Sequence, residues 1–403
     1  MLKMVDGTGI IGVDMVCPLG GTVSPPQPPN YDKVEVEGVG SLMLPNSLEA
    51  PVERVELIGN SVQGENPAPD NPQEIKSAGR FDEASGKYLF DVKVTGKNLL
   101  NLQKEPDVKG TYQGWKVGDG KKTIILSIKD KGNNVDITKC SIGVSGNGIN
   151  PNDGLGWIVQ DGTILRSEIK TTNPYVTIYP PNETAVQKFL DRFEIQVEYG
   201  TTATPFEPYT EQTLTLTSDR PITKWDKLVE QGGEYGWLYG SKIYVVTGNE
   251  VFESRDGYNI ESYTNRFFIL NDLLKKNDAL KPLAYMKCLR NVQYVYSPNI
   301  FEEGFETNIN QFHIKLSNDR VGILASDDHA VRTAKFSGYM KKIHKNGNPI
   351  EILYATTDTV FFPLSQEEQT QLRNLHSYIG TTNIMVDSGE IPCGIKLTYR
   401  KEI

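Results

Sequence analysis

The sequence predicts a mainly β protein with two antiparallel β-sandwich domains of the jelly-roll type and a few short helices. Segments such as Phe193–Tyr199 alternate apolar and polar residues, which is the period of a strand with one buried face. The chain holds 37 glycines and 23 prolines, and this favours short strands joined by tight turns. Because 403 residues exceed what one hydrophobic core comfortably serves, we expect more than one domain.

The N-terminal part of the chain divides into two regions. Residues 1–32 show little pattern and end in the proline-rich Ser24–Tyr31, which favours an extended linker after an N-terminal attachment segment. Residues 33–79 contain short strands and a proline-punctuated bend. This second region is either a preamble of its own or pairs with C-terminal strands to make one discontinuous domain. Its predicted strands are Lys33–Gly38, Ser41–Pro45 and Arg54–Gln63.

Residues 80–210 are expected to form the first sandwich. Strands recur at intervals of roughly ten residues with Gly and Asn turns between them, a spacing that is typical of sandwiches. One helix, Glu183–Phe193, interrupts them. The predicted strands before it are Tyr88–Val94, Thr123–Lys129, Gly154–Gly162 and Pro174–Pro180.

The last strand of this sandwich and its exit are distinctive. In Phe193–Tyr199 the apolar residues point to one face, and Glu194 and Glu198 lie on the other, where we expect them to be solvated. Gly200 ends the strand. A stiff segment with two prolines, 201–210, then leads to the next domain.

Residues 211–403 are expected to form the second β-rich domain. Helices are predicted at Asn271–Lys276, His329–Lys345 and Ser365–His376, and the last begins with a capping box of Ser365 and Glu368. The predicted strands are Leu214–Ser218, Lys242–Val246, Phe312–Leu316, Val321–Ala325, Glu351–Ala355 and Gly394–Glu402.

Composition excludes several classes of protein. The net charge of −9 argues against a nucleic-acid partner. No apolar run approaches the roughly 18 residues that a membrane span needs, so we expect no membrane insertion, and the N-terminus is a poor signal peptide. The four cysteines, Cys17, Cys140, Cys288 and Cys393, are scattered without metal-ligand spacing, so we predict buried free thiols. We assign no metal site and no cofactor, although the oxygen-rich loops Asn150–Gly154 and Ser326–Asp328 leave a bound calcium ion open.

Five stretches have a distinctive amino-acid sequence: Leu44–Pro51, Gly59–Gln63, Gly96–Leu102, Phe193–Thr210 and Pro349–Gly389. They resemble segments of tail-fibre, baseplate and receptor-binding proteins of phages that infect Gram-positive bacteria. The resemblance does not cover residues from about 220 to 345. It implies a carbohydrate-binding-module-like β-sandwich and a homotrimer that is attached through its N-terminal segment to other tail or baseplate proteins of the virion.

Candidate catalytic residues are few. His329 follows two aspartates, but no G-x-S-x-G elbow accompanies it, and a helix-capping role for the aspartates explains the motif. Gly59–Ser61 has the letters GNS, yet it lacks the GDS block and distant D-x-x-H of an SGNH-type hydrolase, so we interpret it as a turn. The sequence therefore predicts no enzymatic activity.

Sugar binding requires aromatic faces for the apolar side of a pyranose and polar groups for its hydroxyls. Tryptophans of this size are also common core residues, and the aromatic cluster of Gly232–Ser241 is equally compatible with a subunit contact. The candidate glycan-binding residues are Trp115, Trp157, Tyr175, Tyr179, Tyr235, Trp237 and Tyr239.

The function expected from these observations is host adhesion. We expect a phage tail or baseplate receptor-binding protein that recognises a host cell-wall glycan without cleaving it. Two other functions stay open. A purely structural baseplate or tail-fibre subunit would not bind glycans, and a wall-polysaccharide depolymerase would need a carboxylate pair with at least one raised pKa.

Overall fold

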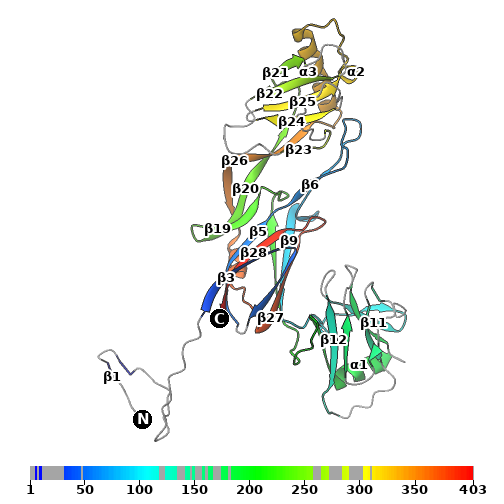
Figure 1. Cartoon of the computed structure of the whole chain (residues 1–403), viewed down its shortest axis with the longest axis vertical. Coiled ribbons are helices and arrows are strands. Elements are labelled where there is room, and N and C mark those ends of the chain that lie inside the picture. Colours follow the sequence, from blue (N-terminus) through cyan, green and yellow to red (C-terminus); the bar gives the residue numbers. More distant parts are fainter. Residues whose placement is uncertain are drawn as a thin grey trace.

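The computed structural model describes residues 5–6, 9–10, 31–46, 49–117, 123–133, 141–145, 148–149, 157–158, 162–166, 174–179, 183–256, 265–271, 284–289, 303–308 and 311–402. In these residues the chain is mainly β with few helices, as the sequence predicts, and it forms three units (Figure 1). Most of residues 1–30, with Cys17 among them, lie outside the described part. Only the paired β1 (Val5–Asp6) and β2 (Gly9–Ile10) are described there, so the attachment segment and its linker remain predictions.

The central unit consists of two antiparallel sheets around one core. The inward faces of the two sheets meet at Phe90 and Trp237, whose ring centroids lie 4.9 Å apart. One sheet has the order β23 (Ala284–Met286), β26 (Glu351–Pro363), β20 (Glu234–Val245), β19 (Lys227–Gln231), β5 (Val52–Ile58), β28 (Gly394–Glu402) and β3 (Tyr31–Val39). The other has the order β18 (Glu211–Ser218), β9 (Lys87–Thr95), β27 (Gly380–Asp387) and β4 (Ser41–Asn46), with β8 (Arg80–Asp82) beside β9.

The first and last segments of the chain build this unit together. Strand β28 pairs with β3 on one side and with β5 on the other, and β4 pairs with β27. The pairing between residues 33–79 and the C-terminal strands is therefore present. A short hairpin of β6 (Ser61–Gln63) and β7 (Ile75–Ser77) extends the same segment.

The inserted unit lies between β9 and β18 in the chain and to one side of the central unit (Figure 1). Its two sheets share a core that includes Phe189 and Ile195. Helix α1 (Glu183–Arg192) confirms the predicted helix. The five-stranded sheet has the order β10 (Asp107–Lys109), β11 (Tyr112–Lys116), β16 (Tyr175–Tyr179), β13 (Ser141–Ser145) and β14 (Trp157–Ile158). The three-stranded sheet has the order β15 (Gly162–Arg166), β12 (Ile124–Asp130) and β17 (Phe193–Tyr199).

The start of the inserted unit differs from the predicted boundary at residue 80. Strand β9, which we assigned to the first sandwich, pairs with β18 and β27 in the central unit instead. Its Phe90, Val92 and Val94 belong to the central core. The alternation of apolar residues in β9 gives the strand correctly but does not identify its partner.

The segment that leads into the inserted unit is hydrogen bonded to the segment that leads out of it. The Asn98 side chain accepts from Val197 N–H at 3.1 Å and donates to the Glu207 carbonyl at 3.0 Å. The Lys97 ammonium lies 2.8 Å from the Glu207 carboxylate and donates to the Pro205 carbonyl at 2.6 Å. Two of the distinctive motifs of the sequence, Gly96–Leu102 and Phe193–Thr210, therefore form one polar junction.

Glu198 departs from the sequence-based expectation that it is solvated. It is only 4% exposed, because the segment after Gly200 folds back over the outer face of β17. There its carboxylate accepts from Thr204 and from Gln196, whose side chain is also buried. Strand periodicity places Glu198 on the outer face correctly, but the covering segment comes from outside the strand.

The distal unit continues from the long ribbon of β20 and β26 (Figure 1). Helix α3 (His329–Lys345) packs on its sheet, with Phe336 against Phe252 at 4.9 Å between ring centroids. The sheet has the order β21 (Phe252–Asp256), β22 (Asn265–Asn271), β25 (Gln311–Ser317) and β24 (Gly304–Asn308). Residues 211–403 thus contribute to two units with separate cores, where one domain was predicted.

The helix predictions have mixed outcomes. The bounds of α3 are confirmed, and α4 (Gln366–Arg373) carries the predicted capping box of Ser365 and Glu368. The predicted strand Val321–Ala325 is wrong, because α2 (Asn318–Val321) occupies its start and ends at Gly322 in the left-handed conformation. Asn271 ends β22, and the rest of the helix predicted there lies outside the described residues.

Candidate functional site

Tyr175 and Tyr179 lie on the outer face of β16, in the five-stranded sheet of the inserted unit. Their neighbours in the strand, Val176 and Ile178, point into the core. On the adjacent strand, Tyr112 contacts Tyr179 with ring centroids 4.1 Å apart, and the two hydroxyls are hydrogen bonded. Tyr179 is 39% exposed. Two of the predicted residues therefore belong to a tyrosine face, defined here as Tyr112, Tyr175 and Tyr179.

Polar groups surround this tyrosine face. The Tyr175 hydroxyl donates to Asp107 of β10, and this hydrogen bond raises the pKa of Tyr175 to about 12. Lys109 of β10 donates to the Ile149 carbonyl at 3.2 Å. Between the aromatic residues, Thr177 is buried, and its hydroxyl has no hydrogen-bond partner among the described residues. Aromatic rings, a carboxylate, an ammonium group and a hydroxyl are thus gathered on one sheet face.

The two tryptophans predicted for this unit have different positions. Trp115 is 5% exposed and donates from its indole N–H to the Lys104 carbonyl at 2.9 Å. It is a core residue, so its ring faces are not available to a ligand. Trp157 lies in β14 in register with Gly143, and its side chain is outside the described residues.

The aromatic cluster of β20 is also buried. Tyr235, Trp237 and Tyr239 are between 2% and 8% exposed and share the central core, since β20 lies inside its sheet and is covered by the opposing one. Their common face is confirmed. Trp237 donates to the Thr217 carbonyl at 2.6 Å, and the Tyr239 hydroxyl lies 2.7 Å from the Ser218 hydroxyl. These side chains pack the fold and do not form an exposed aromatic surface.

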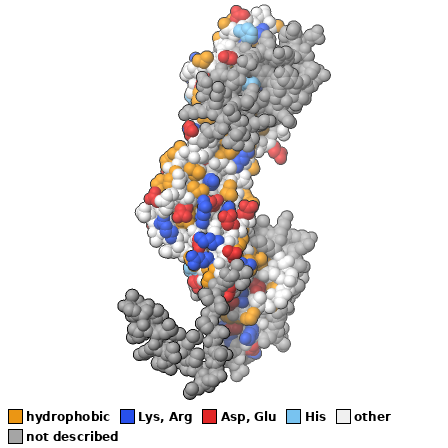
Figure 2. Space-filling view, turned by 60° about the vertical axis from the view of Figure 1, so that its left-hand side comes forward, with side chains coloured by type: hydrophobic (Ala, Val, Ile, Leu, Met, Phe, Trp, Pro, Cys, Tyr) orange, Lys and Arg blue, Asp and Glu red, His pale blue; other side chains and the backbone are white. Residues whose placement is uncertain are grey.

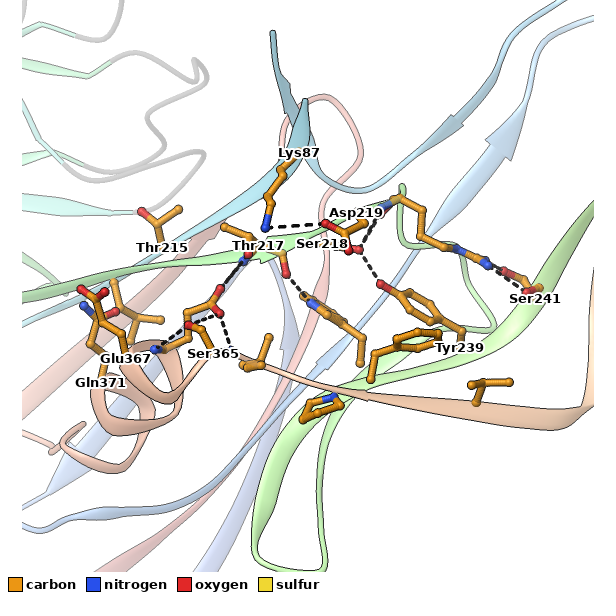
Figure 3. Close-up of a pocket in the computed structure, with 18 of the residues that line it drawn as sticks. Lys87, Thr215, Thr217, Ser218, Asp219, Tyr239, Ser241, Ser365, Glu367 and Gln371 are labelled. Atoms are coloured by element: carbon orange, nitrogen blue, oxygen red, sulfur yellow. Dashed lines mark hydrogen bonds and ion pairs between the residues drawn. The ribbon is translucent and has the colours of Figure 1, made fainter. Parts of the chain in front are cut away.

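A pocket of about 940 Å³ opens beside this cluster (Figure 3). Strand β18 forms one wall, the end of β26 forms the opposite wall, and the start of α4 closes one end. Trp237 and Tyr239 line its inner side, whereas Tyr235 does not. Phe362 on β26 is 52% exposed, and its ring centroid lies 5.2 Å from that of Tyr239. The pocket therefore has an aromatic floor and a strand edge as a wall.

Several polar side chains of the pocket are already hydrogen bonded to other parts of the protein. Glu368 accepts from Thr217 N–H at 2.7 Å and from the Ser365 hydroxyl at 2.6 Å. Arg220 lies over the Tyr239 ring and donates to the Ser241 carbonyl at 3.1 Å.

On the surface of the middle of the molecule, basic, acidic and hydrophobic side chains are interspersed (Figure 2).

No group of three or more His, Cys, Asp or Glu side chains in the described part of the chain is placed to hold a metal ion. No helix there has both the length and the apolar character that crossing a membrane requires. Comparison of the chain with family models, with curated proteins and with solved structures found no match.

Several residues of these two sites were not identified from the sequence. Tyr112 bonds to Tyr179, which lies 67 positions further along the chain, and Asp107 bonds to Tyr175, 68 positions further along. Only the strand pairing brings such distant residues together. Phe362 and Val360 alternate along the end of β26, but only the structure shows that this end is exposed.

Proposed function

We propose that the protein is a phage tail or baseplate adhesin that binds a host cell-wall glycan at the tyrosine face of the inserted unit and does not cleave it. The observation that carries this proposal is the Tyr112–Tyr179 ring pair, flanked by Tyr175 and Asp107 on the same sheet face. Tyrosine rings offer an apolar surface to a pyranose, and their hydroxyls and the carboxylate offer partners to sugar hydroxyls.

The proposal includes the arrangement implied by the sequence resemblance. The inserted unit would be a carbohydrate-binding-module-like sandwich, and three chains would assemble on the tail through their N-terminal segments. A single shallow sugar site binds with millimolar affinity, on the order of 4 kcal/mol. Three linked copies would raise the avidity by roughly 10²–10⁴ without any new contact. Weak sites used several times therefore suit attachment to a repetitive wall polymer.

The shifted pKa values of the described carboxyl groups identify no candidate for the acid of a glycosidase. A glycosidase needs an acid whose pKa is raised toward neutrality. Among the described residues, each carboxyl whose pKa departs from the ordinary range departs downward. A hydrogen bond from Lys335 lowers the pKa of Asp327, and hydrogen bonds from Lys33 and Arg400 lower that of Glu53.

A single assay tests the proposal. The purified full chain is incubated with polysaccharide fractions of Gram-positive cell walls, and both retention of the protein and release of reducing ends are followed. We expect retention without release. Tyr112→Ala and Tyr179→Ala should each weaken retention about tenfold, whereas Tyr31→Ala, at an exposed tyrosine of β3, should not change it.

The other outcomes are informative. Release of reducing ends would show a depolymerase. Retention that is unchanged in both tyrosine-face variants would remove the site from the proposal. No retention on any wall fraction would favour a purely structural tail subunit.

A further inference from the structure

The pocket of Figure 3 arises from the unequal widths of the two central sheets. Strand β18 is an edge strand of its sheet, whereas the opposing sheet continues past it to β26. Phe362 is in register with Trp237, and Val360 is in register with Tyr239, so the four side chains share one sheet face. The pair on β20 is buried under β18, but Phe362 and Val360 remain 52% and 44% exposed. The overhang therefore presents an apolar ledge that the fold itself does not cover.

The wall opposite the ledge carries backbone hydrogen-bonding groups. Thr217 directs its N–H to Glu368 and its carbonyl to Trp237, and both bonds point away from β9. Backbone groups alternate in an antiparallel ladder, so Thr213 and Thr215 direct theirs to the same side. Their side chains are exposed and line the pocket. Free edges of sheets are usually covered or charged, and here the edge faces a concave space.

The lining has no excess of either charge. Lys87 lies 3.6 Å from Asp219, and Arg220 and Glu368 are held by neighbours in the fold. The charged lining residues are three basic and three acidic: Lys87, Arg220, Lys242, Asp219, Glu367 and Glu368. A charge-balanced lining favours an uncharged ligand over a phosphate or a carboxylate. The volume of about 940 Å³ is within the range of small-ligand pockets, roughly 300–1,000 Å³.

We propose that this pocket is a second saccharide site, separate from the tyrosine face, that takes a neutral mono- or disaccharide. The apolar face of a pyranose packs on Phe362. Its hydroxyls bond to the outward backbone groups of Thr213 and Thr215 and to polar side chains of α4, such as Gln371. The site goes beyond the proposed adhesin function, because it lies in another unit and shares no residue with the tyrosine face.

The test uses the full chain and soluble probes. Glucose, galactose, rhamnose, N-acetylglucosamine and their β-linked dimers are titrated by saturation-transfer NMR and calorimetry, with glycerol phosphate as the charged comparison. We expect at least one neutral probe to bind. Phe362→Ala should weaken that binding about tenfold, and Phe362→Trp should retain it because an aromatic face is preserved. Ile379→Ala, at another exposed apolar residue of the central unit, is the matched control and should have no effect.

The variants separate this site from the tyrosine face. Tyr179→Ala should leave the Phe362-dependent binding unchanged, so the failure of one proposal does not affect the other. Three results would overturn the second site: neutral probes that bind equally well to Phe362→Ala, glycerol phosphate as the preferred ligand, or no binding of any saccharide in the panel. The second site would also be overturned if an extended peptide, and no sugar, crosslinked to β18.

Discussion

The carboxylate of Glu198 is held by both hydrogen-bond donors of Thr204. The Thr204 N–H donates to one oxygen at 2.9 Å, and its hydroxyl donates to the other at 2.7 Å. Gln196 donates to the same carboxylate at 2.8 Å and accepts from Glu207 N–H at 2.8 Å. This network seals the exit segment to β17, and through Lys97 and Asn98 it also reaches the entry segment. Polar contacts therefore fasten the entry and exit segments of the inserted unit to β17 and to each other.

Glu198→Ala should loosen the inserted unit. The substitution removes an acceptor of the buried Gln196 side chain and of the Thr204 N–H and hydroxyl, while Gln196 keeps its contact with the Thr204 carbonyl, so we expect a cost of roughly 1–3 kcal/mol. Hydrogen exchange followed by mass spectrometry should show faster exchange in peptides from β12 and β17. Glu194→Ala, on the same strand face but outside the network, is the control and should exchange as the wild type does. Equal exchange in the two variants would mean that the network does not hold the unit.

Asp226 is the polar centre of the central unit. It is 1% exposed and accepts from Thr223 N–H at 2.9 Å, from Gly240 N–H at 2.9 Å and from the Ser241 hydroxyl. Gly240 stands where the register between β20 and β26 shifts, so the carboxylate fastens an irregular point of the ladder.

Asp226→Ala should lower the free energy of unfolding by roughly 3–5 kcal/mol, because several buried donors lose one acceptor. Urea unfolding followed by tryptophan fluorescence measures the loss. Asp219→Ala provides the control, since that side chain is 89% exposed and its removal should change stability by less than about 0.5 kcal/mol. A loss of similar size in both variants would contradict this role of Asp226.

Much of the local structure could be predicted from the sequence. The capping box of Ser365 and Glu368, the helix that starts at His329 and the strand Phe193–Tyr199 all depend on residues close in the chain. In each case an alternating or helical pattern continues up to a clear terminal signal. Short-range chemistry decides these elements, and the structure confirms them.

The sites themselves depended on strand pairing, which the sequence does not reveal. Tyr112 meets Tyr179 only because β11 and β16 are neighbours. Trp237 is a candidate from the sequence for either a glycan-binding ring or a subunit contact, but the opposing sheet covers it and leaves Phe362 exposed instead. The burial of Glu198 likewise follows from a segment outside its strand. Residue type and periodicity predict a face, whereas the number of strands in each sheet decides whether that face is covered.

The stability of the distal unit should fall in acid. Burial alone would raise the pKa of Glu303, but hydrogen bonds from Arg320 and Ser317 outweigh burial and hold it below the ordinary 4.5. A lowered pKa in the folded state contributes stability that is present above pH 4.5 and is lost as the pH falls through the folded value. Urea unfolding between pH 3 and 7 should show this loss.

Glu303→Gln should flatten the pH dependence of the distal unit below pH 4.5 and lower its stability at pH 7. The neutral amide can still accept from Ser317 N–H, but it loses the negative charge and the second oxygen, which lies 2.9 Å from Arg320 Nε. Glu74→Gln, at an exposed position, should preserve the wild-type profile. An unchanged acid transition in Glu303→Gln would show that other groups control it.

Cys393 should resist alkylation in the folded protein. Its thiol is fully buried, and burial raises its pKa to about 11, so little thiolate exists at pH 8. Treatment with iodoacetamide at pH 8, followed by peptide mapping, should leave Cys393 unmodified until a denaturant is added. Rapid native alkylation at this position would indicate that the central core opens locally.

The surroundings of Gly59 give a structural reason for the glycine of the GNS motif. A Cβ atom at this position would lie 2.1 Å from the Thr223 carbonyl oxygen, and Gly59 N–H donates to the Asp226 carbonyl at 2.9 Å. The chain approaches so closely here that only glycine fits. Ser61 is buried, and its hydroxyl accepts from Lys224 N–H at 3.4 Å, so it is a packing residue.

Gly59→Ala should therefore destabilise the central unit by roughly 3 kcal/mol, since the added methyl group pushes β5 and the segment before β19 apart. Gly338→Ala is the opposite case. Gly338 is an exposed position inside α3 with open space around it, and alanine should stabilise the helix by about 0.5–1 kcal/mol. Thermal unfolding of both variants measures the two effects. A neutral Gly59→Ala would show that the strands can separate at little cost, and the turn would then need another explanation for its glycine.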